Sequence, residues 1–438
     1  MKRLCLTMVL LTIIASTSVL QSQDIANRVV VVNGGAYSNP YDFVTVTAFD
    51  PETTVTEYLA TIHTQSVQGL LVHNGFAYVA AQDSLAKINI DNGVVEKCVL
   101  ATGVNKIAVH NDKLIISRQF PVTSGFVQIR SLTDLTLMAT FDEITDEAWD
   151  IAIAGDTAYV SVAGGWTSTT GKLALINLAD LSFIKEIDLG PDAIGIGPVF
   201  QNNNQLIFVC KTPWGGNSGS LVKYETASGA YTVHPFLAVL GKAAGIHNDT
   251  LYLLINGNVG TIDLNTMSIT NPNLIQNPYD TLMITALCLE TINHKIYVNY
   301  SYWIASPEGH GIIYDLDGTN VGNYPVGISA EEVAVDYRNT ALVKKPELSD
   351  KNVTCYPNPC QDLLFVENIP AHSQIIIFDL QGRRLLTHNH QDGDQAAIDL
   401  SRLSGGMFYL YVQPVEVTIN TGAYSPNLVQ NSILFIKQ

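Results

Sequence analysis

The chain has 438 residues, of which 47% are hydrophobic and only 14% are charged, with a formal net charge of −17. Average soluble proteins contain about 25% charged residues, so most of this surface must consist of uncharged polar residues, which is typical of extracellular β-proteins. A surface of this charge repels phosphate backbones and anionic lipid headgroups. We therefore expect no nucleic-acid partner and no peripheral membrane surface, whereas neutral ligands and cations are easier partners.

Residues 1–23 have the pattern of a secretory signal peptide. Lys2 and Arg3 precede an apolar run up to Leu20, and small and polar residues follow it. This order of basic, apolar and small residues predicts cleavage before residue 24. No later stretch is apolar over the length that a membrane-spanning helix needs, so we expect a secreted chain without a transmembrane segment.

The cysteines do not form a disulfide framework. Beyond Cys5, inside the predicted signal peptide, five cysteines remain, which is an odd number, and they are scattered along the chain. Small disulfide-stapled domains have even numbers at regular spacing. A bridge between Cys355 and Cys360 stays open, and the remaining thiols are expected to be buried.

A short pattern recurs six times: an apolar run, a polar turn of Asn, Asp or Gly, and a second apolar run. One aromatic or aliphatic residue of the second run marks the equivalent position in each copy: Tyr78, Ile115, Tyr159, Ile207, Tyr252 and Tyr297. The intervals between these positions are 37, 44, 48, 45 and 45 residues. About 40 to 50 residues are typical of one four-stranded propeller blade, so each copy predicts a blade with strands a to d from the axis outward.

The copies predict a closed ring of seven blades. Six complete repeats begin near Gln68, Asn105, Ala148, Ile194, Lys242 and Met283. Residues 28–32, 43–49 and 55–62 look like strands b, c and d without an a, and residues 332–337 look like an isolated strand a. Joining these fragments gives a seventh blade and leaves no open sheet edge. The sequence therefore predicts an all-β, seven-bladed β-propeller over residues 24–343.

The repeat rhythm and the recurring Tyr-Val after a polar turn resemble the YncE-like seven-bladed propellers of bacterial surface and periplasmic proteins. The resemblance covers about residues 25 to 343. It implies the fold and leaves the activity open.

After a linker at residues 344–350, residues 351–438 contain three motifs. They are Tyr356-Pro357-Asn358-Pro359, then Ile375 to Leu380 closed by Gln381-Gly382-Arg383, then Ile398 to Tyr409. In this order they resemble the type A C-terminal sorting domain of the type IX secretion system of Bacteroidetes. The resemblance implies that the type IX machinery is a partner and that the protein is secreted or displayed on the outer-membrane cell surface.

The residues that carry this resemblance are predicted to form the sorting motif. They are Tyr356, Pro357, Asn358, Pro359, Asp379, Gly382, Gly405, Gly406 and Tyr409. Apolar runs of strand length parted by Pro and Gly turns predict a small immunoglobulin-like β-sandwich. Two departures from the family pattern are the cysteines beside the first motif and the long stretch at residues 414–430 before the last strand.

The chain has no motif of a known catalytic, metal or cofactor site. His73, His110 and His247 recur in three repeats, but each begins an a–b turn, and such positions lie far apart around a propeller. Residues 315–320 begin like a calcium loop but lack the late Glu, so we expect a plain c–d turn there. No catalytic residue, metal or cofactor is therefore predicted.

The aromatic residues point to one face. In a propeller, the b–c and d–a loops open on one face around the central channel, which we call the loop face, and the a–b and c–d turns open on the other, the turn face. The predicted ligand-binding residues all lie in or beside the first set of loops: Trp149, Trp166, Trp214, Trp303, Tyr302, Tyr37, Tyr41 and Phe120. Exposed tryptophans on one face are typical of a binding surface, although each could instead pack on its neighbouring blade.

Three functions remain open at this point. The first is a binding protein whose loop face captures a small nutrient, a glycan or a protein, and the resemblance to surface propellers that capture cobalamin makes a corrinoid one candidate. The second is a hydrolase or lyase of the lactonase kind that uses Asp150, Glu331 or Glu332 near the channel. The third is a surface-layer or adhesion module, which predicts no small-molecule pocket.

Overall fold

The computed structural model describes residues 24–36, 38–213, 215–302, 309–339, 353–369, 373–379, 384–391, 393–414 and 432–437. Contacts between residues divide the chain into two compact units, Met1–Leu342 and Val343–Gln438. Within these described ranges, no helix is long and apolar enough to cross a membrane.

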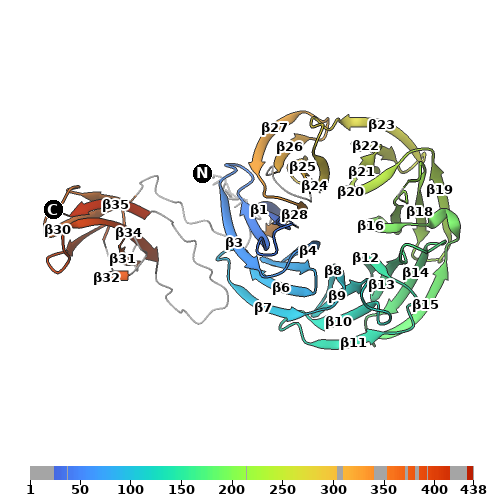
Figure 1. Ribbon diagram of the computed structural model, residues 1–438, viewed down its shortest axis with the longest axis horizontal. Coiled ribbons are helices and arrows are strands. Elements are labelled where there is room, and N and C mark those ends of the chain that lie inside the picture. The colour runs from blue at the N-terminus through green and yellow to red at the C-terminus, as the bar shows by residue number, and fades with distance from the viewer. Residues whose placement is uncertain are drawn as a thin grey trace, which may run out of the picture. The chain divides into compact units, whose positions relative to one another are not determined.

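The first unit is a ring of seven four-stranded antiparallel sheets, each ordered from an inner to an outer strand (Figure 1). Blade 2 consists of β4 (Val67–His73), β5 (Phe76–Ala81), β6 (Ser84–Asn89) and β7 (Val95–Leu100). Blade 3 consists of β8 (Val104–His110), β9 (Lys113–Arg118), β10 (Val127–Ser131) and β11 (Leu137–Phe141). Blade 4 consists of β12 (Ala148–Ala154), β13 (Thr157–Val162), β14 (Lys172–Asn177) and β15 (Ser182–Asp188).

The remaining blades continue around the ring after a short 3-10 helix at Pro191–Ala193. Blade 5 consists of β16 (Ile196–Asn202), β17 (Gln205–Cys210), β18 (Gly219–Glu225) and β19 (Tyr231–Phe236). Blade 6 consists of β20 (Leu240–His247), β21 (Thr250–Ile255), β22 (Asn258–Asp263) and β23 (Ser268–Ile275). Blade 7 consists of β24 (Met283–Glu290), β25 (Lys295–Ser301), β26 (His310–Asp315) and β27 (Asn320–Pro325).

Blade 1 is built from both ends of the propeller sequence, which confirms the predicted closure. Its inner strand is β28 (Ala330–Asn339), and β1 (Asp24–Asn33), β2 (Val44–Phe49) and β3 (Thr56–Ile62) follow outward. β28 pairs with β1 along most of its length, with Val335 opposite Val29 and Val333 opposite Val31. All seven predicted blades are therefore present, and the pairing of β28 with β1 closes the ring.

The hydrophobic core lies between neighbouring blades. Strands b and c are covered on both faces, so their sequences are nearly continuous apolar runs. Between blades 1 and 2, for example, Val46 and Ala48 of β2 belong to the same buried cluster as Ala77 and Val79 of β5. The outer strands are largely exposed to solvent, as in β7, and carry polar residues of the surface.

The polar turn of the repeat has a backbone reason. Asn74 has a φ of 48° and Gly75 one of 78°, and Asn111 and Asn248 have φ values of 53° and 48°. This left-handed region is costly for most residues and is tolerated best by Gly and Asn. The turn residues thus set the tight a–b connection that makes the repeat visible in the sequence.

The second unit is a small β-sandwich. One sheet is ordered β29 (Thr354–Tyr356), β30 (Leu363–Glu367) and β33 (Gln395–Asp399). The other is ordered β32 (Arg384–His390), β31 (Ser373–Phe378), β34 (Gly406–Pro414) and β35 (Ser432–Lys437). Leu364 and Val366 of the first sheet share one buried cluster with Ile375, Ile377 and Leu410 of the second. Cys355 and Cys360, for which a bridge was left open, are both free thiols.

Candidate functional site

A β-bulge interrupts the inner strand of every blade close to its first residue. In β8, two residues, Asn105 and Lys106, lie opposite the single Ser117 of β9. In β12, Trp149 and Asp150 lie opposite Ser161 of β13 in the same way. Because a bulge bends its strand and redirects a side chain, each blade can turn one residue from the sheet toward the axis.

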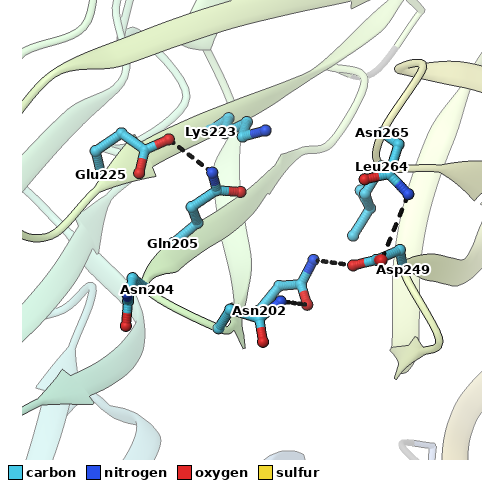
Figure 2. Close-up of a pocket in the computed structure, with 9 residues that line it drawn as sticks. Asn202, Asn204, Gln205, Lys223, Glu225, Asp249, Leu264 and Asn265 are labelled. Atoms are coloured by element: carbon cyan, nitrogen blue, oxygen red, sulfur yellow. Dashed lines mark hydrogen bonds between the residues drawn. The ribbon is translucent and has the colours of Figure 1, made fainter.

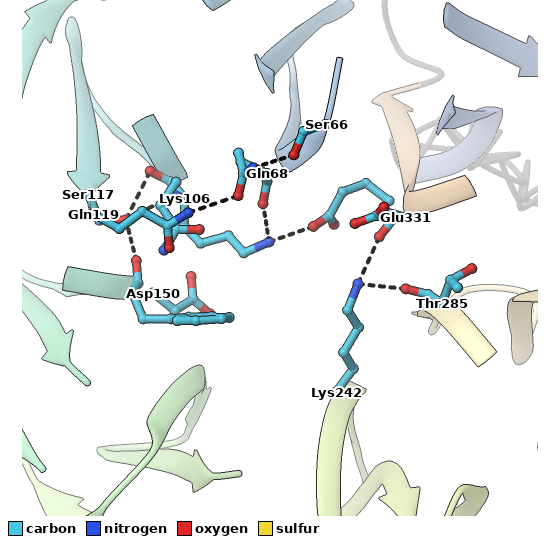
Figure 3. Close-up of polar contacts among 12 residues, drawn as sticks. Ser66, Gln68, Lys106, Ser117, Gln119, Asp150, Lys242, Thr285 and Glu331 are labelled. Atoms are coloured by element: carbon cyan, nitrogen blue, oxygen red, sulfur yellow. Dashed lines mark hydrogen bonds and ion pairs between the residues drawn. The ribbon is translucent and has the colours of Figure 1, made fainter. Parts of the chain in front are cut away.

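These redirected residues form a ring, which we call the channel ring. Its members, in order around the propeller, are Gln68, Lys106, Asp150, Pro198, Lys242, Thr285 and Glu331. Figure 3 shows the polar members gathered around the central opening. Each inner strand begins where a d–a loop enters it, so the channel ring lies at the loop face.

Two lysines of the channel ring reach across it to the closing strand β28. Lys106 Nζ in blade 3 lies 2.5 Å from Glu332 Oε1 in blade 1. Lys242 Nζ in blade 6 donates to the backbone oxygens of Thr285 at 2.6 Å and Glu331 at 3.1 Å (Figure 3). The contacts with Glu332 and Glu331 each skip one blade, so they hold β28 from both directions. Both ammonium groups therefore have a structural partner.

A third lysine enters from the end of β17 and has no such partner. Lys211 Nζ lies 3.4 Å from the ring centroid of Trp149, on its face, as in a cation–π interaction. Within the described part of the chain, this ammonium has no hydrogen-bond or ion-pair partner. Gly197 makes room for it, since a Cβ there would lie 3.3 Å from Lys211 Cε.

The surroundings of Lys211 favour its neutral form. Burial lowers the pKa of Lys211 to about 7, and the positive charges of Lys106 and Lys242 act in the same direction. Asp150 and Glu332 oppose this shift without cancelling it. An amine with this pKa exchanges its proton near neutrality, whereas an ordinary lysine stays charged.

Asp150 is one of the two carboxylates of the channel ring, and backbone amides hold both of its oxygens. Oδ1 accepts from Ile151 N at 2.9 Å, and Oδ2 accepts from Val199 N in the next blade at 3.0 Å. Burial raises the pKa of Asp150, while these amides and the charge of Lys106 lower it. Asp150 therefore joins blades 4 and 5 and has little free capacity to accept another donor.

Two buried serines fix the shape of the bulges. Ser161 Oγ accepts from Asp150 N at 2.8 Å and lies 2.9 Å from Gly197 O, to which it can donate. Ser117 Oγ accepts from Lys106 N at 2.9 Å and donates to Trp149 O. Each serine thus satisfies the amide that the bulge frees and ties its blade to the next one.

Three of the predicted ligand-binding aromatics are fully exposed on the loop face. The exposed fractions are 93% for Trp166, 81% for Tyr41 and 77% for Phe120, and they belong to the b–c loops of blades 4, 1 and 3. Leu237, which the sequence did not single out, is 97% exposed in the d–a connection between blades 5 and 6. The loop face therefore presents apolar side chains from several blades, and a role in binding remains a prediction.

The other predicted aromatics have different places. Trp149 belongs to the bulge of β12 and covers Lys211. Tyr302 is half-buried and packs against the core of blade 7. Trp214, Trp303 and Tyr37 lie outside the described residues.

The carboxylates considered for catalysis each have a partner. Glu332 pairs with Lys106, and the carboxylate of Glu331 accepts from Ser329 Oγ at 2.6 Å. Among the residues that the structure describes, no group of three or more His, Cys, Asp and Glu side chains is arranged to hold a metal ion. The segment from Asp315 forms the turn between β26 and β27.

A polar hollow of about 360 Å³ lies on the turn face between blades 5 and 6 (Figure 2). Its amides and carboxylates are already paired with one another. Asn202 Nδ2 donates to Asp249 Oδ1 at 2.9 Å, and Gln205 Nε2 donates to Glu225 Oε1 at 2.7 Å. Lys223 also lines the hollow, and the hollow lies on the face opposite to the predicted binding loops.

The first sorting motif contacts the last strand of the sandwich through Asn358. Asn358 Oδ1 accepts from Ile436 N in β35 at 3.0 Å, and Cys360 N donates to Ile436 O at 2.8 Å. Tyr356 donates to Glu367 at 2.7 Å. Pro357 and Pro359 flank Asn358, and Asp379 is buried just after β31. Gly405 precedes β34, and Gly406 and Tyr409 belong to it. Gly382 lies outside the described residues.

Sequence reasoning missed the three lysines of this site. Lys106 and Lys242 occupy the same repeat position as Asp150, the third residue of the inner strand. The sequence signal that could have revealed Lys106 and Lys242 was a charged residue at the third position of several inner strands. Lys211 lies at the end of a b strand, and nothing in the repeat distinguishes it.

Residues 354–421 match the family described as the secretion system C-terminal sorting domain. The chain therefore carries a type IX C-terminal sorting domain behind a propeller and is a secreted or cell-surface protein. No curated protein sequence matches the chain.

The propeller is similar in fold to solved structures. A hypothetical selenium-binding protein from Sulfolobus tokodaii is 10% identical with a TM-score of 0.53, over 72% of this chain and 93% of that one. A candidate 6-phosphogluconolactonase from Bacteroides fragilis is 11% identical with a TM-score of 0.52, over 71% of this chain and 98% of that one. At such low identity the likeness shows the propeller fold alone.

Proposed function

We propose that this exported protein is a binding protein that captures a small ligand on the loop face of its propeller, above the channel ring. One observation carries the proposal. The bulge of β12 places Trp149 against Lys211 at the channel, on the same face where Trp166, Tyr41 and Phe120 expose their rings. Large aromatic side chains around a few convergent polar groups are typical of small-molecule sites.

The polar hollow of the turn face supports a second site less well, because several of its amides and carboxylates already pair with one another. An adhesion module would need no ligand over the channel. The small ligand is therefore the candidate that the geometry favours, and a corrinoid, a haem or a glycan are the first compounds to test.

The experiment is a thermal-shift screen of the purified protein against corrinoids, haem, glycans and divalent metals. A ligand that binds only the folded state stabilises it by about 2.7 kcal/mol at a concentration of 100 Kd. Once a ligand is found, Trp166→Ala and Phe120→Ala should each weaken its binding, because aromatic anchors carry much of the binding energy. Their Tm without ligand should stay near that of the wild type, because both side chains are exposed.

The matched control is Tyr58→Ala, which removes an aromatic side chain that is 61% exposed on the outer strand β3. It should leave the ligand-induced shift unchanged. A ligand whose binding survives both loop substitutions but is lost in Asp249→Asn would move the site to the turn face and overturn the proposal.

A further inference from the structure

Of the three lysines at the channel, one has no oxygen partner among the described residues. Lys106 Nζ contacts Glu332, and Lys242 Nζ contacts two backbone oxygens. Lys211 Nζ has only the face of the Trp149 ring, and no oxygen of the described residues accepts from it. A largely enclosed ammonium without an acceptor is costly, so this position is incomplete as it stands.

The nearby carboxylates differ from Lys211, because each of them already accepts from a group of the protein. Asp150 accepts two backbone amides, and Glu332 accepts from Lys106. Glu331 accepts from Ser329. Each of these carboxylates thus has at least one donor within the protein, whereas Lys211 Nζ has no oxygen partner among the described residues, which argues for an acceptor group supplied from outside.

We propose that the channel entrance binds an oxyanion, a carboxylate or a phosphate group, of the captured ligand, with Lys211 as its direct contact. The inference rests on the proposed function, since it names the chemistry that the loop-face ligand must carry. The oxyanion accepts from Lys211 Nζ, and Lys106 and Lys242 attract it without leaving their own partners. Trp149 holds the amine from its other side and keeps it at the channel.

Binding of an oxyanion is coupled to a proton. The groups that face Lys211 are Lys106 of β8, Asp150 of β12, Lys242 of β20 and Glu332 of β28. Burial and the two lysines lower the pKa of Lys211 to about 7, and a bound anion raises it again, so binding takes up a proton above neutral pH. Affinity should therefore fall as the pH rises from 6.5 to 8.5.

The test is isothermal titration calorimetry of the full chain with sodium acetate and with inorganic phosphate, at constant ionic strength. We expect one saturable site for at least one of these probes. Lys211→Met should weaken it at least tenfold, because the thioether keeps the bulk and the contact with the Trp149 ring but carries no charge. Lys211→Arg should retain binding, and Lys185→Met, which removes an exposed lysine on the outer strand β15, should leave it unchanged.

The acetate titrations are repeated at pH 6.5 and 8.5, because acetate itself stays ionised throughout this range. Tighter binding at pH 6.5, lost in Lys211→Met, supports the inference. Failure of both probes to bind, or equal affinity in the wild type and Lys211→Met, overturns it.

The same measurements separate this inference from the proposed function. If a screened ligand binds the wild type and Lys211→Met equally but loses affinity in Trp166→Ala, the oxyanion contact is wrong and loop-face capture stands. If acetate or phosphate binds through Lys211 while no screened ligand depends on Trp166 or Phe120, the loop-face proposal fails and the oxyanion site stands.

Discussion

Ser161→Ala tests whether the buried serines hold the bulges of the channel ring. Ser161 is fully buried, and its hydroxyl accepts from Asp150 N at 2.8 Å and lies 2.9 Å from Gly197 O. The substitution changes no other atom of the side chain, so it leaves one buried donor and one buried acceptor without a partner. At about 1–3 kcal/mol for each such group, the free energy of unfolding should fall by about 2–6 kcal/mol.

Urea denaturation followed by circular dichroism measures this loss, with an unchanged m-value expected because the folded ring stays closed. The control is Ser182→Ala, whose exposed hydroxyl bonds only to the neighbouring Asp180 side chain at 2.6 Å and should change stability by no more than about 0.5 kcal/mol. A loss of less than about 0.5 kcal/mol in Ser161→Ala would refute the idea that this hydroxyl supports the bulge.

Three further predictions concern export, closure and pH. Deletion of residues 351–438 should leave a folded propeller that is retained in the periplasm, and normal amounts in the medium, measured by immunoblot of cell fractions, would contradict the export route. Ending the chain at Glu331 removes nearly all of β28 and should abolish cooperative thermal unfolding; a variant that melts like the intact ring would disprove the closure. Since Lys211 has a pKa of about 7 when folded but an ordinary value of 10.5, the unfolded chain binds more protons between these pH values, and the free energy of unfolding should rise from pH 7 toward pH 10. In Lys211→Met this rise should be smaller, as urea titrations at pH 7 and 9.5 would measure; identical slopes in both proteins would argue against the shifted pKa.

The number of blades was predictable because the repeat is a local signal. Each polar turn requires left-handed backbone at residues such as Asn74 and Asn248, so the turns recur in the sequence at the period of the blades. The strand at residues 332–337 could be assigned to the first blade by a physical argument, since a ring with unpaired edges would be unstable. Blade count and closure therefore followed from turn chemistry and edge pairing.

The channel ring was not predictable in the same way. A strand with regular alternation would send successive residues to opposite faces, whereas a bulge places Trp149 and Asp150 together against one residue. Whether a strand contains a bulge depends on a partner such as Ser161, which lies in another strand. The proximity of Lys211 and Trp149 depends further on how blade 5 packs on blade 4, and no local pattern encodes it.

The position of β28 in the chain links closure of the propeller to the presence of the sorting domain. The strand that closes the ring precedes the sorting domain in the chain. A chain shortened at its C-terminus, by early termination of translation or by proteolysis, therefore loses the sorting domain before it loses β28. Every product that lacks β28 therefore also lacks the signal for display. Propellers that lose β28 by truncation from the C-terminus, and so leave an edge of β1 unpaired, should therefore not reach the cell surface, because the sorting domain is lost first.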